Sequence, residues 1–242
     1  MSTGTFLLFA LVVFGASVVQ GVSGFAFGLI VLMIFPGLFG YTDALVLASL
    51  MTVVLLIYNS ILYRRYCNWQ WMAVGVPVFA LADLFGVLVL KRVGDAPIWY
   101  TLLGVLFICM AIYLMWGQER LPIKADRKTL VLFSGVTGAL VGAFGVGGPI
   151  MAAFFLAATK SKEEYLGTIQ VTSLFGMGLD VVFRAANGMV TLELIKLTGL
   201  GLVFLVAGML VAKRIVRYID ARMLRRIVCV LMVLNGVVTL FH

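Results

Sequence analysis

Apolar stretches long enough to cross a lipid bilayer follow one another along almost the whole chain. A spanning helix needs about 20 predominantly apolar residues, and most of these stretches have about that length. They run approximately over Thr5–Phe39, Asp43–Tyr63, Gln70–Leu90, Pro97–Trp116, Thr129–Thr159, Tyr165–Ala186, Leu192–Ala212 and Met223–Phe241, with a polar loop over Gly117–Lys128. This pattern predicts an all-α, polytopic membrane protein.

Two of the stretches, Thr5–Phe39 and Thr129–Thr159, are too long for one crossing and carry glycines near their middle. Glycine in a helix interior costs about 1 kcal/mol relative to alanine, so closely spaced glycines favour an interruption. We therefore interpret each long stretch as a broken pair of helices, either a re-entrant hairpin or two short crossings. Broken backbone at membrane depth is tolerated only where it is buried in protein or lines a cavity.

The interruption in the second long stretch can be placed from its local sequence. Gly145, Gly147 and Gly148 lie close together, and Pro149 follows them directly. Proline lacks an amide donor and suits the first turn of a helix. We expect one helix to end near Phe144 and a new helix to begin at about Pro149. The start of the new helix would direct free amides and a positive dipole end toward an anion.

Composition excludes a large soluble domain and gives no sign of a metal or cofactor. The chain is 63% hydrophobic and only 12% charged, whereas soluble domains carry about a quarter charged residues. The net charge of +8 is better explained by orientation in a membrane than by a nucleic-acid partner. Cys67, Cys109 and Cys229 are scattered and odd in number, so they predict neither a disulfide framework nor a metal cluster.

The lysines and arginines select between the possible topologies. If each long stretch returns to the side where it began, one face collects Arg64, Arg65, Arg120, Lys124, Arg127, Lys128, Lys160, Lys162, Lys213, Arg214, Arg217, Arg222, Arg225 and Arg226. The other face then holds only Lys91, Arg92, Arg184 and Lys196. A single crossing by each long stretch would divide the charges almost evenly. Cytoplasmic loops are enriched in Lys and Arg, so we prefer the paired interpretation, with both termini outside.

The two halves of the chain resemble each other weakly. A shift of 121 residues aligns Gly21 with Gly142 and Gly24 with Gly145, and one further residue of shift aligns segment 86–92 with segment 208–214. We predict two inverted membrane repeats, each with a broken helix pair and three spanning helices, over residues 1–117 and 129–242, joined by a cytoplasmic linker over 118–128. Inverted repeats with interrupted helices are typical of secondary transporters that work by alternating access.

Polar residues form matching stripes on two otherwise apolar helices. One stripe comprises Gln170, Ser173, Met177, Asp180 and Arg184, and the shift of 121 aligns it with Ser49, Thr52, Leu56, Asn59 and Tyr63. Each set has the spacing of one helical face. Such stripes face protein or water rather than lipid, so they either join helices by hydrogen bonds or line a cavity. Because the stripes accompany matching glycine breaks, we favour a cavity for Thr52, Asn59, Ser173 and Asp180.

Three charged residues within the apolar stretches are functional candidates. Asp180 and Arg184 are four residues apart and can form an ion pair. In one alternative the pair is structural and Arg184 snorkels outward. In the other, Arg184 attracts an anion at the outer mouth, and Asp180 holds the guanidinium until the substrate competes. Asp83 lies deep in an apolar run and is, like Asp180, a proton-coupling candidate, although a carboxyl hydrogen-bonded to a neighbouring helix is an equal alternative.

A serine motif in the first break raises the possibility of an enzyme. Gly21-Val-Ser23-Gly24 formally matches the Gly-x-Ser-Gly motif of rhomboid intramembrane proteases. A nucleophilic serine needs a base within hydrogen-bond reach, and the one histidine of the chain is the last residue, His242. We therefore expect the protein not to be an enzyme.

The second glycine motif, Gly138, Gly142, Gly145, Gly147, Gly148 and Pro149, resembles that of the sulfite exporter TauE/SafE family. The first-half echo Gly21-Val-Ser-Gly-Phe-Ala-Phe-Gly28, the length and the central charged loop agree with this resemblance over nearly the whole chain. The resemblance implies a bacterial inner-membrane carrier of a small sulfur-containing anion, such as sulfite, sulfoacetate or thiosulfate. Phe25 and Phe27 depart from the tighter glycine cluster and could suit an organic tail.

The leading hypothesis is therefore a secondary transporter that exports such an anion by alternating access. The substrate would bind near mid-membrane at the starts of the half-helices. Its predicted binding residues are Ser23, Gly24, Gly28, Thr52, Asn59, Gly145, Gly147, Gly148, Pro149, Gln170, Ser173 and Arg184. The expected partners are the anion and the lipid bilayer, and such a carrier could form a homodimer. The alternative is a non-transporting scaffold or assembly subunit whose glycines serve helix packing only.

Overall fold

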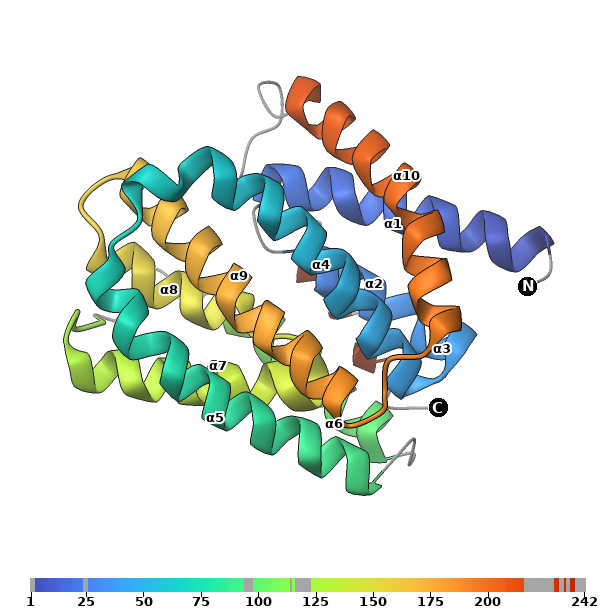
Figure 1. Cartoon of the computed structure of the whole chain (residues 1–242), viewed down its shortest axis with the longest axis horizontal. Helices are drawn as coiled ribbons and strands as arrows, with labels where there is room; N and C mark the ends of the chain where they lie inside the picture. The colour runs from blue at the N-terminus through green and yellow to red at the C-terminus, as the bar shows by residue number, and fades with distance from the viewer. Residues whose placement is uncertain are drawn as a thin grey trace. The chain divides into compact units, whose positions relative to one another are not determined.

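The computed structural model describes residues 3–23, 26–93, 98–113, 115, 123–215, 229–230, 233 and 236–237. Its elements are α1 (Thr3–Ser23), α2 (Phe27–Ile34), α3 (Pro36–Phe39), α4 (Tyr41–Tyr63), the short 3₁₀ helix η1 (Arg64–Tyr66), α5 (Trp69–Val93), α6 (Ile98–Ile112), α7 (Arg127–Phe144), α8 (Gly148–Ala158), α9 (Lys162–Ala186) and α10 (Leu192–Ile215). Figure 1 shows that all these elements are helices. The all-α prediction is confirmed for the described residues.

Among the described residues, five helices are long and apolar enough to cross a membrane. These spans are Thr3–Gly21, Tyr41–Tyr66, Trp69–Val93, Glu163–Ala186 and Leu192–Ile215. The prediction of a multi-pass membrane protein is confirmed, and the predicted apolar stretches match α4, α5, α9 and α10 closely. The predicted last span, Met223–Phe241, lies mostly outside the described residues.

The chain forms two compact units. Unit 1 comprises residues 1–51, 94–120 and 190–242, and unit 2 comprises residues 52–93 and 121–189. Each unit therefore combines segments from both halves of the chain, and the boundary between the units falls within α4. The predicted repeats, residues 1–117 and 129–242, were defined by sequence similarity, which a division into compact units does not test. Their boundaries stay a prediction.

In unit 2, α5 and α7 lie side by side (Figure 1) because small residues allow their backbones to approach closely. A Cβ added at Gly138 would meet the backbone of Phe79, and one added at Gly142 would meet the backbone of Asp83. From the other side, a Cβ at Gly86 would lie 2.7 Å from the carbonyl oxygen of Ala139. These glycines thus fix the separation of α5 and α7.

In unit 1, α1 packs on α10 in the same manner. A Cβ at Gly208 would lie 2.6 Å from the carbonyl oxygen of Phe14, and a Cβ at Gly21 would meet the side chain of Ala212. The rings of Phe9 and Phe35 stack nearby with centroids 5.3 Å apart. Each unit therefore pairs the helix before a predicted break with a helix from the other half of the chain.

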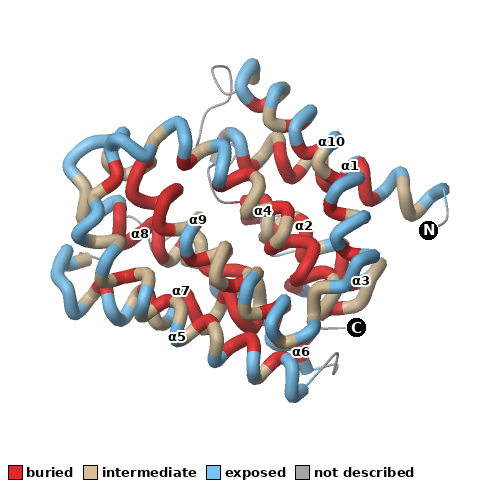
Figure 2. Tube along the Cα trace, viewed as in Figure 1, coloured by how far each residue is buried: buried red, intermediate tan, exposed pale blue. Residues whose placement is uncertain are grey.

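The helices around the second break are anchored at both ends. A core cluster of unit 2 holds α8 through its buried residues Met151, Phe154 and Phe155, and Figure 2 colours buried positions red. At the start of α7, the Asp126 side chain accepts a hydrogen bond of 2.7 Å from the amide of Thr129. This bond holds the pKa of the Asp126 carboxyl below its usual value. The cap therefore fixes the start of α7, and the core holds α8 in place.

Candidate functional site

The second predicted break lies where the sequence placed it. Helix α7 ends at Phe144, and Gly145 caps it with a φ of 67°, in the left-handed region that favours glycine. The Gly145 amide donates to the carbonyl of Val141 at 2.8 Å. Helix α8 then begins at Gly148, with Pro149 in its first turn. The predicted end near Phe144 and restart near Pro149 are confirmed.

The unwound segment between α7 and α8 leaves backbone donors open. Among the described residues, the amides of Val146, Gly147 and Gly148 have no acceptor. A Cβ at Gly147 would lie 2.7 Å from the Thr137 methyl carbon and 2.9 Å from its carbonyl oxygen. Only glycine therefore allows the start of α8 to pack so closely on α7. Several unpaired amides at a helix start favour a negative ligand.

Arg184 of α9 connects this break to a buried ion pair. Its Nε donates to both carboxylate oxygens of Asp180, at 2.8 and 2.9 Å. Its Nη2 donates to the carbonyl oxygens of Val141 and Gly142, at 3.1 and 3.0 Å. Those carbonyls belong to the last turn of α7, where the Val141 oxygen also accepts from the Gly145 amide, whereas no described backbone amide donates to the Gly142 oxygen. Arg184 thus satisfies the end of α7 and holds it against α9.

The same side chain retains one unused donor group. Arg184 and Asp180 are both 0% exposed, and Arg184 Nη1 has no hydrogen-bond partner within the described part of the chain. The predicted i, i+4 ion pair is confirmed. Of the two alternatives for Arg184, outward snorkelling is wrong, because the guanidinium is fully buried and donates to the α7 carbonyls; attraction of an anion stays a prediction. A buried cation with a free donor can bind an anion strongly.

Asp83 brings a second carboxyl into this region from α5. It is 0% exposed, and neither of its carboxyl oxygens has a hydrogen-bond partner among the residues described. Asp180 and Arg184 lie close enough to act on its charge. The alternative of a carboxyl hydrogen-bonded to a neighbouring helix stays open, because the Asp180 carboxyl of α9 lies within reach of Asp83. Two carboxyls and one guanidinium thus share a buried site in unit 2.

Most other candidate residues also fall in unit 2. Gln170 is buried, its side-chain oxygen lacks a described partner, and its backbone carbonyl accepts a 3.0 Å bond from the hydroxyl of Ser60. Thr52, Asn59 and Ser173 are half-buried. That these side chains line a cavity, rather than join helices, stays a prediction.

The first predicted break differs in detail from the second. Helix α1 ends at Ser23 and α2 begins at Phe27, so an interruption is present. The amide of Phe27 donates to the side-chain oxygen of Gln20 at 2.9 Å, which caps the start of α2. Gly28 is half-buried in the first turn of α2, whereas Gly24 and the side chain of Ser23 lie outside what the structure describes.

Sequence reasoning missed several buried polar residues. Gln20 was not singled out, and neither were Ser134 and Thr137 on α7 or Thr168 and Thr172 on α9. The hydroxyls of Ser134, Thr137 and Thr172 have no partner among the described residues. The available signal was helical spacing within each helix: Ser134 and Thr137 are three residues apart, and Thr168 and Thr172 are four residues apart.

The comparisons with known proteins give the family. The model of the family described as sulfite exporter TauE/SafE matches residues 9–239, which is nearly the whole chain. Searches among curated proteins and among solved structures find no significant match. The match agrees with the multi-pass helical fold and with the glycine break after α7. The chain therefore belongs to the sulfite exporter TauE/SafE family of membrane transporters.

Proposed function

We propose that the protein is a secondary transporter of a small sulfur-containing oxyanion, such as sulfite, thiosulfate or sulfoacetate, and that it works as an exporter by alternating access. Family membership supports the class of substrate. The proposal places the protein in a bacterial inner membrane, with both termini outside, as the distribution of Lys and Arg predicts.

One observation carries the proposal: a helix restarts inside an apolar protein with three amides unpaired among the described residues. An oxyanion accepts several such hydrogen bonds at once, and partial charges at a helix start attract it without a full opposite charge. Ligation by several weak donors also allows the substrate to leave again, as transport requires. Gly145, Gly147, Gly148 and Pro149 are the residues that create this geometry.

The buried charges of unit 2 would couple the anion to a proton. Asp83, Asp180 and Arg184 carry a net charge of about −1 when all are ionised, which is costly in a low-dielectric interior. A bound anion would add to this charge, so its entry is favoured when a carboxyl takes up a proton. Asp83 is the better candidate, because Asp180 already holds Arg184.

Transport in liposomes tests the proposal. Purified protein should move radiolabelled sulfite, thiosulfate or sulfoacetate, and Gly147→Ala should abolish the movement because the new Cβ displaces the start of α8. Gly199→Ala is the matched control, since Gly199 is exposed and a Cβ there would meet nothing within 4 Å. A protein that moves none of these anions would favour the scaffold alternative. Equal transport by both variants would remove the break from the binding site.

A further inference from the structure

An apolar groove with two arginines at its end lies on the surface of unit 2. The groove has a volume of about 550 Å³ and is lined by Tyr58, Ile61, Leu62, Arg64 and Arg65. These residues occupy the last turns of α4 and the following η1. The span that contains them, Tyr41–Tyr66, is one of the candidate membrane crossings. The groove therefore runs along the end of a membrane helix, where the bilayer core meets its headgroups.

The apolar part of the groove is exposed and faces one direction. Tyr58, Ile61 and Leu62 are 53%, 66% and 56% exposed. Together with Arg65 they follow the i, i+3, i+4, i+7 spacing of a single helical face. On a helix that crosses a membrane, such a face contacts lipid chains or another apolar surface.

The basic end of the groove is available to an anion. Neither Arg64 nor Arg65 forms a salt bridge with any described residue. The Arg65 guanidinium carbon lies 4.6 Å from the centroid of the Tyr66 ring, which holds the planar group by its face and leaves its N–H edges to donate. The nearby Glu164 carboxylate is already engaged, by the side-chain amide of Asn68 at 3.0 Å and the backbone amide of Lys160 at 2.9 Å.

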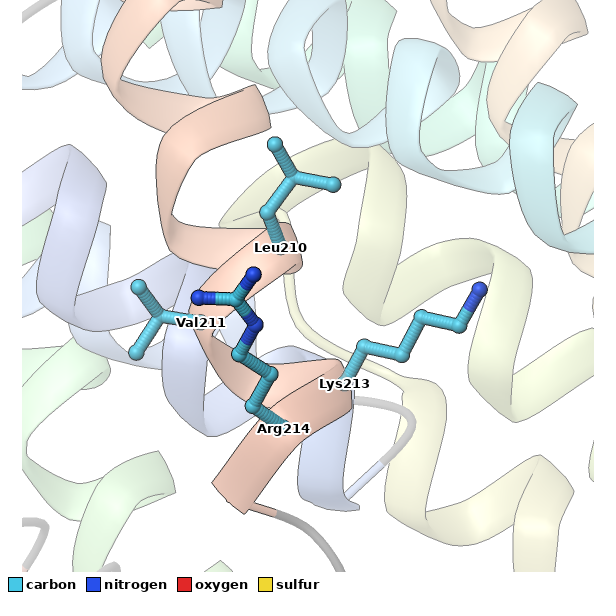
Figure 3. A pocket seen from close by; sticks show the side chains of 4 residues that line it. All are labelled: Leu210, Val211, Lys213 and Arg214. Carbon is cyan, nitrogen blue, oxygen red and sulfur yellow. The ribbon is translucent and has the colours of Figure 1, made fainter.

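The same combination occurs independently in unit 1. A pocket of about 540 Å³ at the end of α10 is lined by Leu210, Val211, Lys213 and Arg214. Figure 3 shows the Lys213 and Arg214 side chains diverging from the helix, with Leu210 and Val211 beside them. All four basic residues of the two pockets belong to the face that the charge distribution predicts to be cytoplasmic. Anionic lipids are attracted to such basic helix ends.

We propose that the groove at the end of α4 binds an anionic glycerophospholipid. The phosphate accepts hydrogen bonds from Arg64 and Arg65, and an acyl chain lies along Tyr58, Ile61 and Leu62. Guanidinium groups suit phosphate because they donate two parallel N–H bonds. The pocket at the end of α10 is a second site of the same class. These lipids would hold the ends of α4 and α10 at the membrane surface, and the transported anion does not occupy them.

Native mass spectrometry and lipid titration test the α4 site. Purified protein should bind phosphatidylglycerol in preference to phosphatidylcholine, and Arg64→Gln/Arg65→Gln should weaken phosphatidylglycerol binding about 30-fold. The matched control is Arg127→Gln/Lys128→Gln, which removes two adjacent exposed basic residues from the predicted cytoplasmic face but lines neither pocket. The control should lose far less affinity. Inorganic phosphate should not compete, because it lacks the acyl chain.

A second variant separates the groove from general charge. Ile61→Trp keeps every charge and an apolar surface but fills the groove, so it should also weaken phosphatidylglycerol binding. Equal losses in the arginine variant and in its control would mean diffuse attraction and would overturn the proposal. Unchanged binding in Ile61→Trp, competition by inorganic phosphate, or a dimer that dissociates in Ile61→Trp without lipid loss would also overturn it.

Discussion

Removal of the buried arginine should destabilise unit 2 more than removal of its ion-pair partner. In Arg184→Gln, the carboxyls of Asp83 and Asp180 remain in a fully buried site without a cation, and two carbonyls of α7 lose their charged donor. In Asp180→Asn, by contrast, the guanidinium keeps both α7 carbonyls and still has the Asp83 carboxyl within electrostatic reach. Substitutions of the two partners of this ion pair should therefore lower the free energy of unfolding by unequal amounts.

The magnitudes follow from the surroundings of each charge. Breaking a buried ion pair by removing one partner costs about 3–5 kcal/mol, and we assign this full cost to Arg184→Gln. Asp180→Asn should cost about 1–3 kcal/mol, the range for leaving one buried group poorly satisfied. Adding Asp180→Asn to Arg184→Gln removes one of the two carboxyl groups left without a cation. The double variant should consequently be more stable than Arg184→Gln alone.

Denaturant unfolding of the three variants in detergent, followed by circular dichroism, measures these differences as a double-mutant cycle. Size-exclusion chromatography first verifies that each variant is folded and monodisperse. Additive effects of the two substitutions would show that Asp180 and Arg184 do not interact. A double variant less stable than Arg184→Gln, or an Arg184→Gln protein as stable as the wild type, would refute the assignment of a buried charge cluster.

Three further predictions concern packing, capping and titration. In thermal unfolding, Gly138→Ala should destabilise the protein by about 1–3 kcal/mol, because the added Cβ meets the α5 backbone. The control Gly135→Ala should be neutral or stabilising, because its Cβ would lie 3.8 Å from the nearest neighbouring atom. Equal effects of the two substitutions would contradict the close packing of α5 and α7. Gln20→Ala should cost about 1 kcal/mol and speed hydrogen exchange in the first turn of α2 without changing the other helices, a pattern that uniform exchange would disprove. Burial raises the pKa of the Cys67 thiol to about 11. The rate of maleimide labelling at Cys67 should therefore rise about tenfold per pH unit between about pH 8 and 10. A plateau of this rate near pH 9 would be inconsistent with the burial.

The parts of the fold that depend on adjacent residues were predictable from the sequence. Gly145 and Pro149 end and restart a helix by their own backbone preferences, so the second break was placed to within a residue. The spacing of Asp180 and Arg184 likewise determines that they can pair. The contacts of Arg184 with α7 were not predictable, because they join residues about forty positions apart and depend on which helices pack together. Burial of Gln20 depends on such packing as well.

The two halves have diverged at the positions that carry charge, which bears on where an anion would bind. The shift that aligns the breaks places Gln20 on Val141: Gln20 supplies an oxygen that caps α2, whereas Val141 supplies a backbone oxygen to Arg184. Similarly, the shift of 122 that aligns segment 86–92 with segment 208–214 places Asp83 on the apolar Leu205. A capping oxygen at the start of α2 would repel an anion there, whereas the start of α8 keeps open amides in the unit that holds the buried charges. The second break is therefore the better anion site of the two, and substitutions at Gly147 should impair transport more than substitutions at Gly28.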